Sequence, residues 1–599
     1  MRHPAGARGI LREGRCCRLR SVNPETSMPA IDIQSVEGPL TGRPARLTWA
    51  SRIVWLWIWL GVIGLALSVH LAFLVAWPDH FLHEDGGAYL DEAQSILTGH
   101  YLDDSGKRPY GVAVFLVLLS KLFGPHILVF VIAQHLMSIA TALLVAATVR
   151  FAGAPRILSV LAFLIAALYA RTVHYDNTIG AETISNFLVG VAAFIAAGLT
   201  FRKWPPIIAA AAVGTTLGAV MTCRSAAVGQ AAVILLWLVM VQDAGWLRRL
   251  SVLALAGSLA TAVYLIPTAV NYAIGKRPAG NESLAVMAFV VGYSADFDHG
   301  VHLDRKANAR AFVEKMRAMD TPTGWADAEV YQWPFGAMHA LEKPGDSANE
   351  FEKVVRDIFI ETLTTPSTLY RHVTRHFLRE VYFLLFDGNS VARRTTNPQA
   401  YEFFVQQAPL PLFGSPTGLK YRRLVYDYYK PHWRLERWLL PTSDQVQVKL
   451  DYLLTLGYQP RPDLADLCCG LTISSEYDDF PGPIRWVSAA ALALMVVLLA
   501  SAVGTRLGLM RPLPAGLAAG GTLMISLALI SVAFPAFLVY GFNRYAYYAV
   551  PFLAGASAIL GAVVFDRVSR LGVSGMLTSW ARRKRPLASP QPSEAGLQP

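Results

Sequence analysis

The most constraining feature of this 599-residue chain is a series of ten long apolar runs, each extending for roughly 17 to 27 residues. A helix needs about 20 apolar residues to cross the hydrocarbon core of a bilayer. Lipid cannot satisfy exposed backbone groups, and the runs lack the alternation of a barrel, so they predict helices. We therefore expect an all-α polytopic membrane protein with about ten transmembrane helices. The runs begin near Ile53, Ile127, Ile157, Ile184, Ile207, Ala226, Leu250, Ile484, Leu513 and Tyr547.

The positions of the basic residues predict how these helices are oriented. With both termini in the cytoplasm, the cytoplasmic segments hold 23 Lys and Arg residues, whereas the short external segments hold five. Cytoplasmic loops of membrane proteins carry such an excess of positive charge. The formal net charge of +11 therefore reports topology, and we expect the lipid bilayer as a partner and no nucleic acid.

The runs divide the chain into five parts, and the first run is expected to be an uncleaved anchor. One insertion between the seventh and eighth runs carries 23 basic and 26 acidic residues, so it is soluble in character, and helical periodicity predicts that it is α-rich. The parts are a disordered Arg-rich cytoplasmic tail (1–52), a seven-helix membrane domain (53–270) with a first external loop (78–108), the extracytoplasmic insertion (271–483), a three-helix membrane domain (484–565) and a basic cytoplasmic tail (566–599).

The first external loop is the most acidic short segment, with seven carboxylates and two cations. Glu84 and Asp85 follow Trp77 closely, which places them near the membrane surface. A partly desolvated carboxylate there has a raised pKa and can act as a general base on a hydroxyl group. Two other interpretations stay open: Glu84 and Asp85 bind a divalent metal with His83 nearby, or the loop is simply acidic and solvated.

Further polar residues are predicted to emerge on the same face as Asp85. Charged groups at the ends of spans are costly unless they pair or serve a ligand, so their convergence predicts a substrate site at the membrane surface. An ion pair between Glu182 and an Arg, or an Arg224 side chain that reaches to the headgroups, is the alternative. The candidate residues are His174, Asp176, Glu182, Arg224, Arg544 and Tyr545.

Several short motifs in the membrane part carry a family resemblance. They are Asp85-Gly-Gly-Ala-Tyr89-Leu90 followed by Ala93, Leu97 and Gly99; Glu182-Thr183; Thr222-Cys223-Arg224; and Arg544-Tyr545 followed by Pro551. In this order they resemble the pattern of the GT-C glycosyltransferases, particularly bacterial relatives of the protein mannosyltransferases and of the lipid A aminoarabinose transferase. In such families the acid of the first loop is the catalytic base or a metal ligand. That role carries over to Asp85, with Glu84 as its acidic neighbour.

The resemblance implies an enzyme of the bacterial inner membrane whose site faces the periplasm. It would transfer a sugar from a polyprenyl-phosphate donor to a glycan, lipid or protein acceptor. Asp85 would deprotonate the acceptor, and Arg224 and Arg544 would stabilise the departing phosphate, with inversion at the anomeric carbon. Tyr89 joins the candidate substrate-binding residues, and a divalent metal ion is the cofactor to consider.

Two other functions use the same features. A polysaccharide polymerase or ligase with diphosphate-linked donors also needs external Arg residues, although the acidic first loop favours the glycosyltransferase. A transporter of a lipid-linked glycan is compatible with ten helices, but transporters carry buried charges near the midplane and repeat symmetry. The first five runs of this chain do not resemble the last five.

Overall fold

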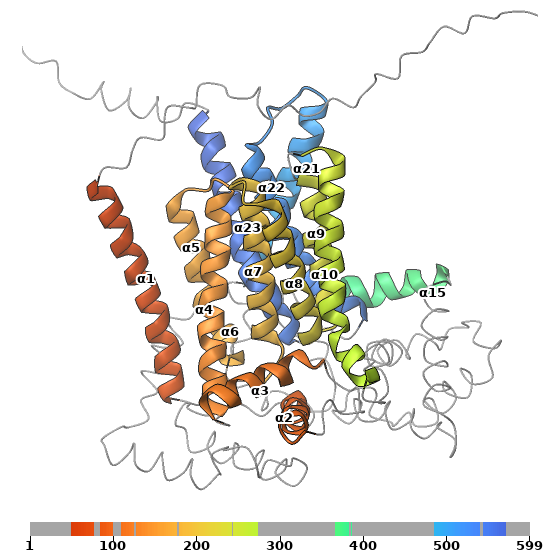
Figure 1. The fold of residues 1–599 in the computed structure, drawn as a ribbon. Helices are drawn as coiled ribbons and strands as arrows, with labels where there is room; N and C mark the ends of the chain where they lie inside the picture. The colour runs from red at the N-terminus through yellow and green to blue at the C-terminus, as the bar shows by residue number, and fades with distance from the viewer. Residues whose placement is uncertain are drawn as a thin grey trace, which may run out of the picture. The chain divides into compact units, whose positions relative to one another are not determined.

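The computed structural model is helical throughout the residues that it describes (Figure 1). Those residues are 49–76, 84–99, 109–124, 127–176, 179–241, 244–273, 364, 366–382, 385, 484–538 and 543–570. The elements in chain order are α1 (Trp49–Ala76), α2 (Glu84–Leu97), α3 (Gly111–Phe123), α4 (Ile127–Phe151), α5 (Arg156–Ala167), α6 (Ala170–Tyr175), α7 (Glu182–Phe201), α8 (Pro206–Cys223), α9 (Ala227–Val241), α10 (Trp246–Ala273), α15 (Pro366–Arg371), the π-helix η3 (His372–Phe377), α16 (Leu378–Tyr382), α21 (Ile484–Arg506), α22 (Ala515–Leu538) and α23 (Asn543–Arg570).

Eight of the described helices are long and apolar enough to cross a membrane, which confirms an α-helical polytopic protein. They are α1, α4, α7, α8, α10, α21, α22 and α23. The two remaining predicted runs form shorter helices. The run from Ile157 gives the 12-residue α5, which a short break separates from α6, and the run from Ala226 gives the 15-residue α9. Eight of the ten predicted runs therefore form helices that are long enough to cross a membrane, and the count of ten spans stays a prediction.

The sequence prediction left out α3, an apolar helix of 13 residues that is too short to be recognised as a span. It runs crosswise to the long helices and contacts α4 and α8 near their lower ends (Figure 1). In the predicted insertion, residues 366–382 are helical, as their periodicity indicates, and they pack on α22 where the rings of Phe377 and Phe537 meet edge to face at 5.8 Å. Most of the rest of the insertion, residues 1–48 and residues 571–599 lie outside the described residues.

Small residues allow the membrane helices to approach closely. A side chain at Gly214 of α8 would collide with the backbone of Ala256 in α10, and one at Gly218 would lie 2.7 Å from the carbonyl oxygen of Ala260. Helices in lipid gain no hydrophobic free energy from association, so van der Waals packing between closely spaced backbones stabilises them instead. The side-chain hydrogen bond from Gln230 Nε2 to Ser531 Oγ, 2.6 Å long, links α9 to α22 in the same interior.

Basic residues gather at the end of the bundle opposite to α3. The guanidinium of Arg202 lies 4.7 Å from the centre of the Phe151 ring, and Arg567 Nη2 donates to the carbonyl oxygen of Arg511 at 2.8 Å. These residues belong to the segments predicted to be cytoplasmic. Which side of a membrane each end faces stays a prediction.

Candidate functional site

The acidic first loop contains a packed helix. Glu84 and Asp85 are the first two residues of α2, although their side chains lie outside the described residues. Tyr89, Leu90 and Ala93 are buried at one face of α2; Ala93 is four positions from Tyr89 and three from Leu90, and these spacings share a side of a helix. They form one apolar cluster with residues of α3. The carboxylates at the start of α2 are therefore carried by a helix that has a fixed partner.

The same cluster connects α2 and α3 to the end of α8. Cys223, the last residue of α8, belongs to it together with Ile184 in the first turn of α7. Gly111 begins α3, and a β-carbon built there would lie 2.7 Å from the backbone nitrogen of Cys223 and 2.7 Å from the carbonyl carbon of Thr222. Only a glycine allows α3 to approach the residue before Arg224 so closely.

We expect Gly111→Ala to destabilise the protein by about 1–3 kcal/mol, because overpacking forces backbone shifts. Thermal unfolding of the purified protein in detergent measures the effect as a lower Tm. Gly257→Ala in α10 is the matched control, since nothing lies within 4 Å of its β-carbon position. An unchanged Tm for Gly111→Ala would show that α3 does not press on α8.

Two predicted site residues meet where α7 begins and α8 ends. Arg224 Nη1 donates to Glu182 Oε1 at 3.2 Å, and the side chains are 13% and 14% exposed. The Arg224 guanidinium also lies 3.8 Å from the centre of the Tyr548 ring in α23. An arginine over an aromatic face gains a cation–π attraction. This geometry matches the ion-pair interpretation of Glu182, and it leaves one face of the guanidinium covered by Tyr548.

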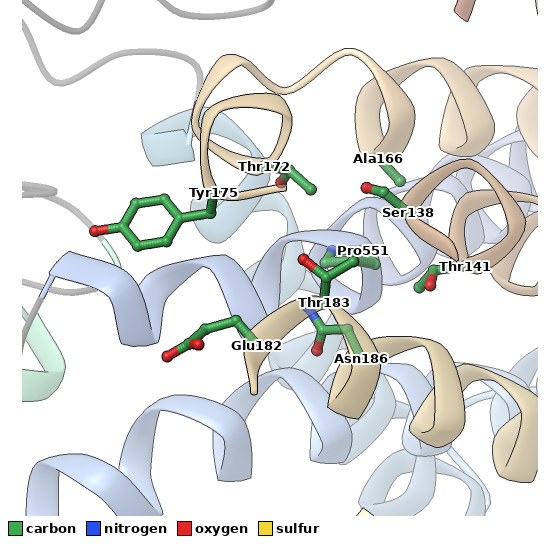
Figure 2. Close-up of a pocket in the computed structure, with 9 residues that line it drawn as sticks. All are labelled: Ser138, Thr141, Ala166, Thr172, Tyr175, Glu182, Thr183, Asn186 and Pro551. Carbon is green, nitrogen blue, oxygen red and sulfur yellow. The ribbon is translucent and has the colours of Figure 1, made fainter. Parts of the chain in front are cut away.

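A small polar pocket adjoins this ion pair and is partly open to solvent; the space in it that water can occupy is about 20 Å³, enough for about one water molecule. Its lining residues are Ser138 and Thr141 of α4, Ala166 of α5, Thr172 and Tyr175 of α6, Glu182, Thr183 and Asn186 of α7, and Pro551 of α23. Figure 2 shows the polar groups of Ser138, Thr172, Thr183 and Asn186 around a common space, with Glu182 and Tyr175 at its rim. Hydroxyl and amide groups of this kind suit a ligand that is rich in hydroxyl groups.

Asp176, another predicted residue, lies next to this pocket but is completely buried. Its Oδ1 accepts a hydrogen bond of 2.6 Å from Thr183 Oγ1, and Ser138 also bonds to its carboxyl group. Gln134 Nε2 donates to its backbone carbonyl oxygen at 2.9 Å. Asp176 lies between α6 and α7, outside the spanning segments, and burial raises the pKa of its carboxyl group well above the usual range.

Two histidines that the sequence prediction missed complete this group. His70 of α1 and His135 of α4 are each 2% exposed, and their Nδ1 atoms are 2.8 Å apart. Asp176 Oδ2 is 3.9 Å from the first and 3.8 Å from the second. Among the described residues, these three form the group whose side chains could hold a metal ion. Ionisable residues within apolar runs are rare, and this signal in the sequence could have identified both histidines.

The structure therefore brings Glu182 and Arg224 into contact and sets Asp176 beside them. Tyr89 is 4% exposed and packs within the apolar cluster of α2 and α3. His174 lies in α6, and Arg544 and Tyr545 lie in the first turn of α23, but their side chains are outside the described ones. The side chains of the predicted metal ligands Glu84 and Asp85 are also outside the described ones. The metal site in the first loop therefore stays a prediction.

No protein-family model, curated protein or solved structure matches this chain.

Proposed function

We propose that this protein is a membrane glycosyltransferase that moves a sugar from a polyprenyl-phosphate donor to an extracytoplasmic acceptor. The observation that carries the proposal is a series of helix contacts. Helix α2, which begins with Glu84 and Asp85, packs on α3, and α3 packs on the last residues of α8, directly before Arg224. An acid and a cation held at one end of a helical bundle are the two kinds of group that this reaction needs.

The chemistry assigns a role to each charge. The Asp85 carboxylate accepts the proton of the acceptor hydroxyl group while the oxygen attacks the anomeric carbon. The bond from that carbon to the phosphate oxygen breaks, and the electron pair leaves with the lipid phosphate. Arg224 and Arg544 stabilise the developing negative charge, since arginine can donate paired hydrogen bonds to phosphate oxygens. A direct displacement of this kind inverts the configuration of the anomeric carbon.

The small polar pocket offers a place for one hydroxyl group of the sugar rather than for the whole ring. It borders Glu182, the partner of Arg224, so a sugar that inserts one hydroxyl group there would have its phosphate near the guanidinium. The donor's lipid tail can stay between helices because the exposed faces of the long helices are apolar, as Leu128, Ile132 and Leu136 of α4 illustrate. The pocket and the ion pair support a donor that is half lipid and half sugar.

A transporter of a lipid-linked glycan is the second candidate, and the His70, His135 and Asp176 group favours it. Buried ionisable residues in a membrane bundle often serve proton or substrate transfer. A transporter would move the donor across the bilayer without breaking the bond between sugar and phosphate.

The two functions are separated by the products they form. The purified protein in nanodiscs is incubated with a panel of polyprenyl-phosphate sugars and an acceptor mixture, with and without a chelator, and free polyprenyl phosphate is quantified by mass spectrometry. We expect release that depends on the protein with at least one donor. No release with any donor, together with donor translocation in proteoliposomes, would replace the glycosyltransferase proposal by the transporter.

A further inference from the structure

The buried group formed by His70, His135 and Asp176 has the geometry of a metal site. Its three facing atoms are the two Nδ1 nitrogens and Asp176 Oδ2, separated by 2.8, 3.8 and 3.9 Å. A point at the centre of the circle through these atoms lies about 2.1 Å from each of them, which equals the usual length of a bond from zinc to histidine or carboxylate. One small cation can therefore contact all three ligands.

Only small movements would give a tetrahedral ion. Bonds of about 2.05 Å to a tetrahedral ion separate its ligands by about 3.3 Å. The distance between the two nitrogens would lengthen by about half an ångström, and each nitrogen-to-oxygen distance would shorten by about the same amount. Rotation of the side chains about their own bonds provides such shifts without moving the helices.

The hydrogen bonding of His70 shows which of its ring nitrogens carries a lone pair. His70 Nε2 lies 3.0 Å from the carbonyl oxygen of Ala167. A carbonyl oxygen only accepts, so the proton of a neutral His70 is on Nε2, and its Nδ1 accepts the 2.8 Å hydrogen bond from His135 Nδ1–H. A bound ion would replace this hydrogen bond, with the proton of His135 moved to its Nε2. Histidine ligands of metals commonly donate their other N–H to a backbone carbonyl in this way.

Asp176 supplies a second and independent observation. Asp176 is fully buried. Its Oδ2 has no hydrogen-bond donor among the described residues, whereas its Oδ1 accepts a hydrogen bond from Thr183. A buried carboxylate oxygen without a donor is costly unless a cation compensates it. The unpartnered oxygen is the one that faces both histidines. Thr183 and Gln134 hold the carboxylate and its backbone in that orientation.

We infer that His70, His135 and Asp176 bind one divalent transition-metal ion, with zinc as the best match to two imidazoles and one carboxylate. The ion would fasten α1 and α4 to the connection between α6 and α7. Ser138 and Thr183, which both bond to Asp176, also line the polar pocket, so the pocket lies one residue away from the third ligand. The inference does not depend on the proposed sugar transfer.

Metal content tests the assignment on the full-length protein. The protein is purified in detergent, exposed to zinc and passed through a chelating resin. The ratio of zinc to protein is then measured by inductively coupled plasma mass spectrometry. We expect about one zinc ion per chain for the unchanged protein and less than about a tenth of an ion for His135→Asn and Asp176→Asn. Both substitutions keep a polar side chain of similar size while replacing a strong ligand by a weak amide.

Gln230→Leu is the matched control, because it also removes a buried hydrogen bond between two membrane helices but lies outside the group. It should keep the full metal content. Should the ligand variants fail to fold, X-ray absorption of the zinc-loaded unchanged protein decides: we expect nitrogen and oxygen neighbours at about 2.0–2.1 Å and the outer-shell signature of two imidazoles. A protein that retains no zinc, a spectrum without imidazole, or folded ligand variants that keep the ion would overturn the inference.

Discussion

Asp85→Asn is expected to lower the rate of sugar transfer by roughly a hundred- to ten-thousand-fold, the usual effect of losing a general base. The amide keeps the size of the side chain but cannot accept the proton of the acceptor hydroxyl group. Asp85 is the second residue of α2, which packs on α3 through Tyr89, Leu90 and Ala93, and the substitution changes none of these three residues. Release of polyprenyl phosphate from the active donor measures the rate.

Two controls make this result specific. Glu84→Gln removes the neighbouring carboxylate and tests which of the two acids acts as the base, so a smaller loss than that of Asp85→Asn is expected. Asp103→Asn removes a carboxylate from the same acidic segment outside α2 and should leave the rate within about twofold of normal. Transfer at the normal rate by Asp85→Asn would exclude Asp85 as the base.

Arg224→Gln is expected to lower kcat/KM by roughly a hundred- to a thousand-fold, the usual effect of removing one donor that stabilises a developing anion. The substitution also leaves Glu182, which is 14% exposed, without its cationic partner, so we expect a lower Tm. Glu182→Gln keeps Arg224 and its contact with Tyr548, so its effect on kcat/KM should be smaller.

The double variant Glu182→Gln/Arg224→Gln separates a catalytic role of Arg224 from a purely structural ion pair. Two neutral amides at this position remove the uncompensated charge, so Tm should recover toward that of the unchanged protein. Activity should stay low, since no cation remains for the phosphate. If activity recovers together with Tm, Arg224 serves only to hold α7 and α8 together.

The extent of the membrane helices was predictable because it depends on local sequence. A run of about 20 apolar residues must satisfy its backbone within itself in lipid, and this rule identified α4, α7 and α22 without knowledge of their neighbours. The same rule fails for short helices. It missed α3, and the runs from Ile157 and Ala226 give helices α5 and α9 of only 12 and 15 residues.

The candidate site was predictable only in part. Its residue types and their common end of the bundle follow from charge at the boundaries of the runs, which pointed to Asp176, Glu182 and Arg224. The partner of each residue did not follow. Glu182 and Arg224 are 42 positions apart, and the sequence left open whether they pair with each other or serve a ligand.

By itself, the sequence determined the helical membrane class, the apolar segments and the residues that can carry charge chemistry, because these depend on the free energy of moving local segments into lipid. Only the tertiary structure decided that His70 and His135, 65 positions apart, face each other and Asp176. It also decided that Arg224 lies between Glu182 and Tyr548. Such contacts depend on how complementary helix surfaces pack, and packing between distant segments leaves no periodic signal in the chain.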